Sequence, residues 1–385
     1  MAPGRVCREA GRGITVSITA TVLLCGPPLS AVGGGPTHIK NMLTSPLRDQ
    51  YRLVHFETGS RGAESPATDE SLSARTFRIV TSPLELAWTI LNLRPSIVHL
   101  NSVLNRKAFL RDAVYLLVSK SLQRRVVFQF HGGSLSTLCA SKWMQLVVRT
   151  VYSIPDALVL LATSEKTDLE KLGICSHLAI IPNGVDVPQF RGTLERVHSG
   201  RVQRLIYMGR LVREKGIFEA IKAIEILRKT TRFEDIKLRI AGSGPATEEL
   251  EAYIAERGLG NSVELVGPVY GNAKVEFLRE ADAFIFPSYH PEGLPYSILE
   301  SLAAGTPVVA SKVAGIPDVV VDRVHGILLT NPRDPAEIVS AVQELDRSQE
   351  ALRIMSRNCI DWATTQLGLE RLATQFGELY ETVRL

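Results

Sequence analysis

Short apolar runs alternate with segments of helical spacing along almost the whole chain. In the first run Val16, Ile18 and Ala20 alternate with polar residues, the period-two pattern of a strand. The runs that predict strands in the N-terminal half are ITVSITATVLLC (14–25), YRLVHF (51–56), SIVHLNS (96–102), RVVFQFHGG (125–133), DALVLLA (156–162) and HLAIIPNGVD (177–186). The segments that predict helices between them lie near 37–46, 84–93, 105–123, 141–153 and 164–173.

The second half repeats the alternation more clearly. Its predicted strands are RLIYMGR (204–210), KLRIAGSG (237–244), SVELVGP (262–268), AFIFPS (283–288), PVVAS (307–311) and GILLT (326–330). Residues 334–383 then predict helices. Strands separated by crossover helices give a parallel sheet covered on both faces, so each half predicts an α/β domain of the doubly wound kind.

The length of 385 residues exceeds what one hydrophobic core serves, so two domains are expected. Residues 187–200 have no strong periodicity, which places the boundary there. We expect residues 1–190 and 191–385 to form two Rossmann-like domains facing a central cleft, with the last helix packing back on the first domain. The polar stretch 58–75 predicts a loop within the first domain, because strand and helix signals resume at once. Ligands are expected at the carboxyl ends of the strands.

Composition is that of an ordinary globular protein, with 45% hydrophobic and 22% charged residues. The five cysteines are scattered and form no CxxC pair, which argues against a disulfide framework and favours a reducing cytoplasm. Arg5, Arg8 and Arg12 before the first apolar run imitate a secretory signal, but the alternation in that run favours a strand. No apolar run approaches the roughly 18 residues of a membrane span.

The positive charge is concentrated in one region. Residues 101–150 hold eight basic residues against a single acid, Asp112. Six of the basic residues lie within the predicted helix at 105–123 or directly after it, together with several apolar ones, and the two arcs overlap. One hypothesis is peripheral attachment to the inner face of a membrane carrying a lipid-linked acceptor, and the alternative is a partly buried helix with solvated ends. Few aromatic residues are interleaved, which argues against a nucleic-acid partner.

Three loops after predicted strands carry candidate chemistry. The glycines of SAVGGGPTH (30–38) permit close approach of an anion, although a tight turn explains them equally well. MGRLVREKG (208–216) places Arg210 and Lys215 where a guanidinium and an ammonium can hold a diphosphate, or where both are merely solvated. In HPEGLPYSILE (290–300), Pro295 suits the first turn of a helix, which sets Glu292 and Glu300, eight positions apart, before and within that helix.

These motifs resemble glycosyltransferase family 4, the retaining nucleotide-sugar transferases of GT-B fold. The matching stretches stand in the family's order: GRLVREKG, IAGSGP, LVGPV, FIFPSYHPEGLPYSILESLAAGTPVVAS, AGIPDVV and HGILL. Glu292 and Glu300 correspond to the EX7E signature of that family. The N-terminal half resembles it more loosely, through GGGPTH, SIVHLNS and FQFHGG.

The resemblance implies a role for each candidate. His131, near the donor sugar, and Glu292 would be the catalytic residues. Glu292 and the amides of Gly293 and Leu294 would hold that sugar. The donor would be a UDP-sugar or GDP-sugar. Arg210 and Lys215 would bind its diphosphate, and Gly34 would approach the diphosphate from the opposing domain. Glu300 would bind the ribose hydroxyls.

The chain departs from the family at Ala314, where a double glycine is usual, and at His325, usually asparagine. Both departures raise the question of donor choice. No DxD or HExxH motif occurs, so no metal is expected, and Arg210, Lys215 and helix dipoles would stabilise the diphosphate. No carboxylate nucleophile is evident, and the resemblance implies retention by internal return.

The resulting expectation is a metal-independent retaining glycosyltransferase that acts on a saccharide or lipid-linked saccharide acceptor in surface polysaccharide or glycoconjugate biosynthesis. The alternatives are a nucleotide-sugar epimerase or hydrolase of the same fold and a non-catalytic nucleotide-sugar binding protein.

Overall fold

The computed structural model describes residues 20–58, 72–133, 135–175, 177–191, 201–290 and 293–385. The first part of the predicted opening strand, residues 14–19, and Glu292 lie outside the described residues. Within the described ranges, twelve strands form two six-stranded parallel sheets, and no helix has both the length and the apolar character needed to cross a bilayer.

The N-terminal sheet has the strand order β2-β1-β3-β4-β5-β6. Its strands are β1 (Ala20–Gly26), β2 (Tyr51–Glu57), β3 (Ile97–Leu104), β4 (Arg125–Gly133), β5 (Ala157–Leu160) and β6 (Leu178–Ile180). Successive residues of β1 point to opposite faces, since Leu23 packs in one hydrophobic cluster and Val22 and Leu24 pack in another. Both faces are buried, which is why the central strands are continuous apolar runs.

Helices cover both faces of this sheet. One face packs against α3 (Leu72–Leu93), α4 (Arg106–Ser121), α6 (Lys142–Tyr152) and α7 (Thr163–Lys171), with the short α5 (Leu135–Leu138) beside them. The opposite face packs against α1 (Gly34–Thr44), α2 (Leu47–Gln50) and the C-terminal helix α16 (Leu369–Arg384). Both layers follow from right-handed crossovers on either side of β1.

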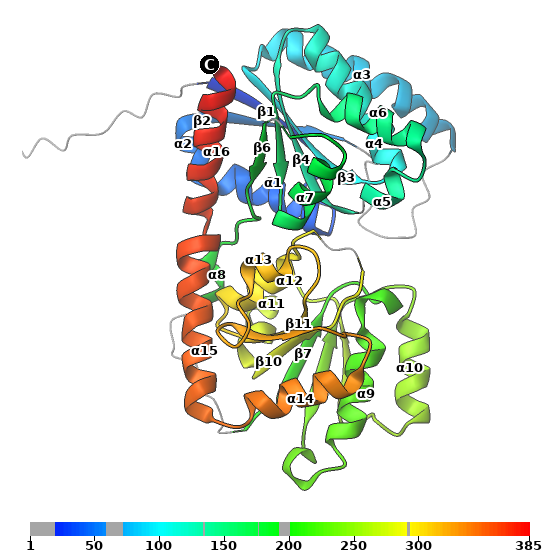
Figure 1. The fold of residues 1–385 in the computed structure, drawn as a ribbon, viewed down its shortest axis with the longest axis vertical. Helices are drawn as coiled ribbons and strands as arrows, with labels where there is room; N and C mark the ends of the chain where they lie inside the picture. Colours follow the sequence, from blue (N-terminus) through cyan, green and yellow to red (C-terminus); the bar gives the residue numbers. More distant parts are fainter. Residues whose placement is uncertain (1–19, 59–71, 134, 176, 192–200, 291–292) are drawn as a thin grey trace, which may run out of the picture.

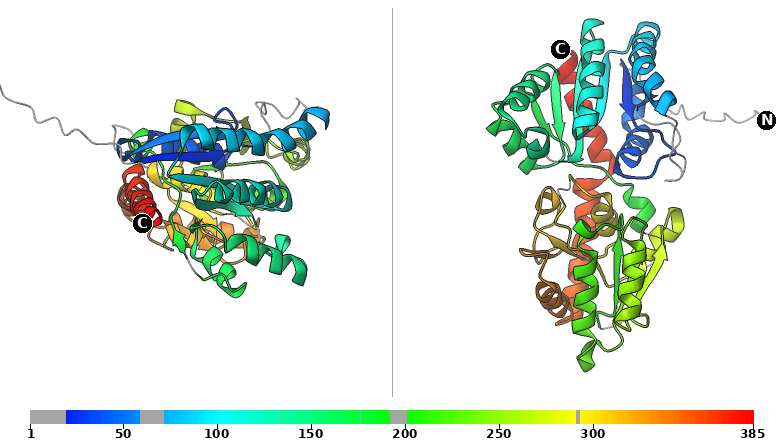
Figure 2. Two further views of the ribbon diagram at one scale, coloured as in Figure 1. Left: turned by 90° about the horizontal axis from the view of Figure 1, so that it is seen from above. Right: turned by 90° about the vertical axis from the view of Figure 1, so that its right-hand side faces the viewer.

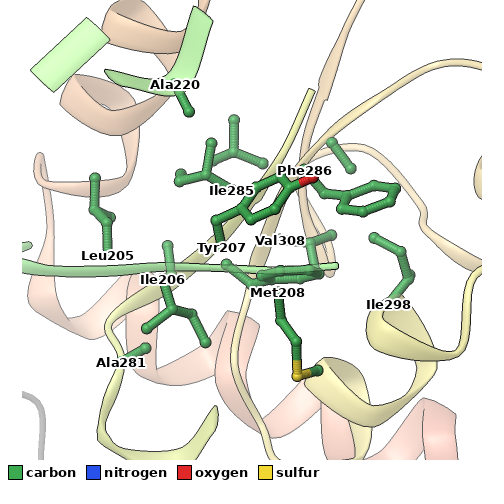
Figure 3. Packing of buried hydrophobic residues seen from close by; sticks show 14 of the residues in the cluster. Leu205, Ile206, Tyr207, Met208, Ala220, Ala281, Ile285, Phe286, Ile298 and Val308 are labelled. Atoms are coloured by element: carbon green, nitrogen blue, oxygen red, sulfur yellow. The ribbon is translucent and has the colours of Figure 1, made fainter. Parts of the chain in front are cut away.

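The C-terminal sheet has the order β12-β11-β10-β7-β8-β9. Its strands are β7 (Arg204–Met208), β8 (Lys237–Ala241), β9 (Val263–Gly267), β10 (Ala283–Phe286), β11 (Val308–Ser311) and β12 (Gly326–Leu329). The other elements of this half are η1 (Arg213–Lys215), α9 (Ile217–Leu227), η2 (Thr231–Phe233), α10 (Thr247–Glu256), α11 (Gly271–Glu280), α12 (Tyr296–Ala303), α13 (Ile316–Val319), α14 (Pro335–Leu345) and α15 (Gln349–Trp362). Figure 3 shows the core between β7 and β10, where the rings of Tyr207 and Phe286 stack 6.1 Å apart.

The C-terminal helices join the two halves. In Figure 1, α15 and α16 form a column along one side of both domains, and the right-hand view of Figure 2 places this column behind them. A π-helical turn, η3 (Ala363–Leu367), connects the two helices. On the N-terminal sheet, the Tyr380 hydroxyl lies 2.6 Å from His99 Nδ1, and the Tyr51 hydroxyl donates to Glu381. The last helix therefore packs back on the N-terminal sheet.

The two sheets confirm the α/β fold class, and the predicted strands are present throughout the described residues. Two local expectations differ from the structure. Helix α3 begins at Leu72, inside the predicted loop, and continues through Pro83, because its packing on the sheet outweighs the lost proline donor. Residues 187–191 form the short helix α8 (Val187–Arg191), whose Val187 and Phe190 are buried.

Candidate active site

A pocket of about 540 Å³ opens between the sheets, at the carboxyl ends of their strands. Three segments line it: the end of β4, the loop after β7 and the loop after β10. Its lining residues are His131, Gly132, Gly133, Arg210, Val212, Glu214, Lys215, His290 and Gly293. This is where doubly wound folds bind ligands, and the size suits a small molecule.

Two cations reach this pocket from the loop after β7. The Leu211 amide donates to the Ser243 carbonyl at 2.9 Å, which fixes the loop against the end of β8. Arg210 is exposed, whereas Lys215 is half-buried with its Nζ 5.4 Å from the centre of the Phe286 ring. A guanidinium fork beside an ammonium favours an anion with several oxygens, such as a diphosphate.

The loop after β7 is tied closely to the segment after β10. The carbonyl oxygen of Glu214 accepts the amides of Tyr289 and His290 at 3.0 and 3.1 Å. Gly216 has a φ of +73°, and a Cβ at this position would lie 2.0 Å from the Pro287 carbonyl oxygen. Only glycine fits there, so the close approach fixes the backbone that carries Lys215.

His131 faces the cations from the N-terminal domain. Its Nε2 lies 2.8 Å from Asn101 Oδ1. The Asn101 amide nitrogen donates to the Cys25 carbonyl at 3.2 Å, which turns Oδ1 toward the histidine, so Nε2 carries the proton. Burial, with smaller effects of His38 and His99, lowers the pKa of His131 well below its ordinary value. The imidazole is therefore neutral at neutral pH.

A second histidine joins this site to the other domain. The ring of His38 lies 4.5 Å from that of His131, and the Tyr296 hydroxyl at the start of α12 lies 3.5 Å from His38 Nδ1. Burial lowers the pKa of His38 to about 4. Gly34 lies at this domain junction, since a Cβ added there would be 3.6 Å from the Tyr296 ring. It does not line the pocket.

Gly293 and Leu294 lie where the two domains touch. A Cβ on Gly293 would be 2.8 Å from the backbone of Gly132, so the glycine permits direct contact between the loop after β10 and the end of β4. Leu294 is buried, and its carbonyl accepts the Asn183 side-chain amide at 3.0 Å. Gly293 lines the pocket, whereas Leu294 lies behind it.

Of the two glutamates of the signature, only Glu300 lies within the described residues. Glu300, in the second turn of α12, is 5% exposed and forms an ion pair with Lys274 of α11 at 2.5 Å. Burial raises the pKa of Glu300, and Lys274 opposes that shift. Glu300 does not line the pocket. A buried carboxylate held by one lysine keeps further acceptor capacity, which suits hydroxyl groups of a ligand.

Sequence patterns did not single out His38, Asn101, Tyr296 or Lys274. Asn101 was detectable as a polar residue near the carboxyl end of an apolar strand, and His38 ends the glycine motif at 30–38, but nothing in the sequence paired them with His131. In the described part of the chain, no group of three or more His, Cys, Asp or Glu side chains is arranged to hold a metal ion.

Comparison with known proteins decides the family. Residues 32–189 match the family described as Glycosyltransferase Family 4, and residues 196–362 match Glycosyl transferases group 1. The chain belongs to glycosyltransferase family 4. It is 25% identical to the glycogen synthase of Mycobacterium tuberculosis over 388 aligned positions, covering 92% of each chain.

Solved structures support the GT-B fold of this family 4 enzyme. The sucrose-phosphate synthase of Thermosynechococcus elongatus aligns with a TM-score of 0.74 and 18% identity over 94% of this chain and 99% of that one. HepE of Anabaena, solved with UDP and glucose, aligns with a TM-score of 0.73 and 16% identity over 94% of this chain and all of its own. These likenesses concern the fold.

The two departures of this glycosyltransferase from its family lie in different places. Ala314 follows β11 on the cleft side and has a φ of +47°, a left-handed conformation that favours glycine. His325 precedes β12 at the opposite end of the sheet, where its Nδ1 accepts the Val321 amide at 3.2 Å. His325 therefore has a local structural role, and its position offers no direct contact with a ligand in the pocket.

Proposed function

We propose that this enzyme transfers a glycosyl group from a nucleoside-diphosphate sugar to a saccharide acceptor with retention and without a metal ion. The observation that carries the proposal is that Arg210 and Lys215 of one domain face His131 of the other across a single pocket. Cations fixed in place stabilise the charge that develops on a leaving diphosphate, which is the largest electrostatic demand of the reaction.

The donor would lie across the domain boundary. Its diphosphate would contact Arg210 and Lys215, its sugar would lie near Gly293 and His131, and Glu300 would accept the ribose hydroxyls. Glu292 is assigned to the sugar by its place in the signature alone. HepE of Anabaena, which shares the fold, was solved with UDP and glucose, and UDP is the first nucleotide to test, followed by GDP.

The reaction step follows from these placements. The acceptor hydroxyl oxygen bonds to the anomeric carbon on the face that the diphosphate leaves, while the carbon–oxygen bond to the diphosphate breaks. The hydroxyl proton passes to an oxygen of the leaving phosphate. Neutral His131, with its proton held toward Asn101, takes no part in that transfer and instead lines the wall beside the sugar.

The acceptor would be a saccharide, free or lipid-linked, in surface polysaccharide or glycoconjugate assembly. The glycogen synthase relative makes a polysaccharide, which supports a saccharide acceptor. A lipid-linked acceptor would place the enzyme at the inner face of a membrane in the cytoplasm. An epimerase, a hydrolase or a binding protein would need no acceptor, so dependence of nucleotide release on added acceptor separates these functions.

The test measures nucleoside diphosphate released from UDP-glucose or GDP-mannose with a panel of saccharide acceptors, in buffer with a chelator. Lys215→Ala should reduce kcat/KM by at least about 100-fold, the effect of losing a preorganised charge at the developing anion. Lys229→Ala changes an exposed lysine outside the pocket and should leave the rate unchanged. Equal rates in both variants would remove Lys215 from the site, and an inverted product anomer would refute retention.

A further inference from the structure

Three neighbouring helices of the N-terminal domain expose apolar side chains on their outer surfaces. In α3 these are Leu84, Trp88 and Leu91, at spacings of four and three residues, and each is more than half exposed. The exposed apolar residues of α4 have the same spacing, and α6 has a shorter stripe of two. The members there are Leu110 (66% exposed), Val114 (44%) and Leu117 (56%) in α4, and Trp143 (70%) and Leu146 (56%) in α6.

The inner surfaces of these helices are apolar as well. Ile90, Leu116 and Val148 belong to one buried cluster against the sheet. The outer stripes are therefore not needed for the core of the domain. Residues that remain apolar without being buried in the chain itself call for a partner.

Contacts on the inner side show that the three helices are neighbours. The Ser82 hydroxyl of α3 lies 2.7 Å from the Tyr115 hydroxyl of α4, and the rings of Phe109 in α4 and Tyr152 in α6 meet at 5.5 Å. In Figure 1 the three helices lie on the flank of the N-terminal domain away from α16. We call the exposed stripes of α3, α4 and α6 the outer face.

The charges on the outer face are mostly positive, and Glu85 of α3 is the one partly exposed acid in the described part of the three helices. Arg106, Lys107, Lys142 and Arg149 are exposed, and within the described residues none of them forms an ion pair. The acid of α4, Asp112, is buried and bound to Arg111 at 2.6 Å.

Two basic residues, one near the end of α4 and one at the start of β4, have structural roles instead. Lys120 and Arg125 bind Asp156 at 2.8 and 3.0 Å. The sequence predicted that the basic and apolar residues of α4 overlap on its surface. In the structure Arg111 and Lys120 form ion pairs within the fold, and the exposed Arg106 and Lys107 lie beside the apolar stripe.

We propose that the outer face docks on an anionic lipid bilayer, with Trp88 and Trp143 inserted at the level of the headgroups. Tryptophan favours that interface, and nearby lysine and arginine are attracted to anionic lipids. A second copy of the chain fits less well, because a two-fold contact would bring the same cations together. Two of the three tryptophans of the chain are on this face, while Trp362 is half-buried elsewhere. The proposal rests on the proposed function only for its purpose, which is access to a lipid-linked acceptor.

The experiment is co-sedimentation of the full chain with vesicles of phosphatidylcholine alone and of phosphatidylcholine with an equal part of phosphatidylglycerol, at low and high salt. The expected result is binding to the anionic vesicles that weakens with salt. The paired change Trp88→Ala with Trp143→Ala should reduce the partition coefficient by about tenfold or more, since binding scales with inserted apolar area. Lys107→Glu with Lys142→Glu should reduce it as well.

Two matched controls change exposed residues that lie outside the outer face. Ile354→Ala removes an exposed apolar side chain from α15, and Lys229→Glu reverses an exposed lysine beyond α9; neither should change vesicle binding. Binding of UDP or GDP should persist in all four variants, so failure of the docking surface and failure of the donor site give different results. Absence of vesicle binding by the wild type, or unchanged binding in the paired variants, overturns the proposal. So does a wild-type dimer that the tryptophan changes dissociate.

Discussion

Replacing Gly216 by alanine tests how the cationic loop is held. The residue has a φ of +73°, which costs an L residue about 1–2 kcal/mol. The new Cβ would also lie 2.0 Å from the Pro287 carbonyl oxygen, against an ordinary carbon–oxygen contact of about 3.3 Å. The loop or the end of β10 must therefore move by about 1 Å.

That movement predicts two separate effects. Steric strain from the added Cβ costs about 1–3 kcal/mol beyond the cost of the left-handed backbone. The free energy of unfolding should therefore fall by about 2–5 kcal/mol in total. A misplacement of about 1 Å at a reacting site lowers the rate about 100-fold, and Lys215 directly precedes the substituted residue. Activity should fall even at temperatures where the variant is fully folded.

Gly258→Ala is the matched control. Gly258 has a φ of +61°, but an added Cβ would meet no atom within 4 Å. This variant should lose about 1–2 kcal/mol of stability from the backbone conformation alone and keep wild-type turnover. Urea denaturation and donor turnover, measured on both variants, separate the two effects. If the Gly216 and Gly258 variants behave alike in both assays, the contact with Pro287 does not position the cationic loop.

Three further changes have defined outcomes. Ala314→Gly should raise the unfolding free energy by about 0.5–1 kcal/mol, because it relieves a left-handed alanine at φ +47°; a lower midpoint in urea would contradict this. Burial raises the pKa of Glu165 to about 7, so the folded state binds a proton more tightly than the unfolded state and stability rises as pH falls from about 7 toward the ordinary glutamate pKa. Glu165→Gln should therefore stabilise the protein by up to about 3 kcal/mol at pH 8 and by little near pH 4, as thermal denaturation at both pH values would show. Asn101→Asp places a carboxylate beside His131 and should raise the histidine pKa, giving kcat/KM a new decline at acidic pH; an unchanged pH profile would refute the neutral role of His131.

The sequence was sufficient for features that depend on strand ends. Arg210 and Gly293 each follow a buried strand of a parallel sheet, and the carboxyl ends of such strands meet at one edge. His131 ends a strand in the other domain, and the family resemblance supplied the facing arrangement of the two. The pocket accordingly brings these residues together.

Contacts between distant segments were not predictable from spacing. His38 meets Tyr296 across 258 positions, and Lys274 meets Glu300 between two helices whose relative rotation no periodic pattern encodes. The outer face was not predicted from the sequence for another reason. Helices that are apolar on both sides resemble buried helices in sequence, and only the burial of Ile90 beside the exposure of Trp88 distinguishes the two surfaces.

The most direct test of the central claim is calorimetric titration of the wild type and of Lys215→Ala with UDP and with GDP, in buffer containing a chelator. The account predicts micromolar binding of one nucleotide to the wild type, without metal, and loss of that binding in the variant. Absence of binding by either nucleotide, or equal affinity in the variant, would contradict a metal-free diphosphate site at Arg210 and Lys215.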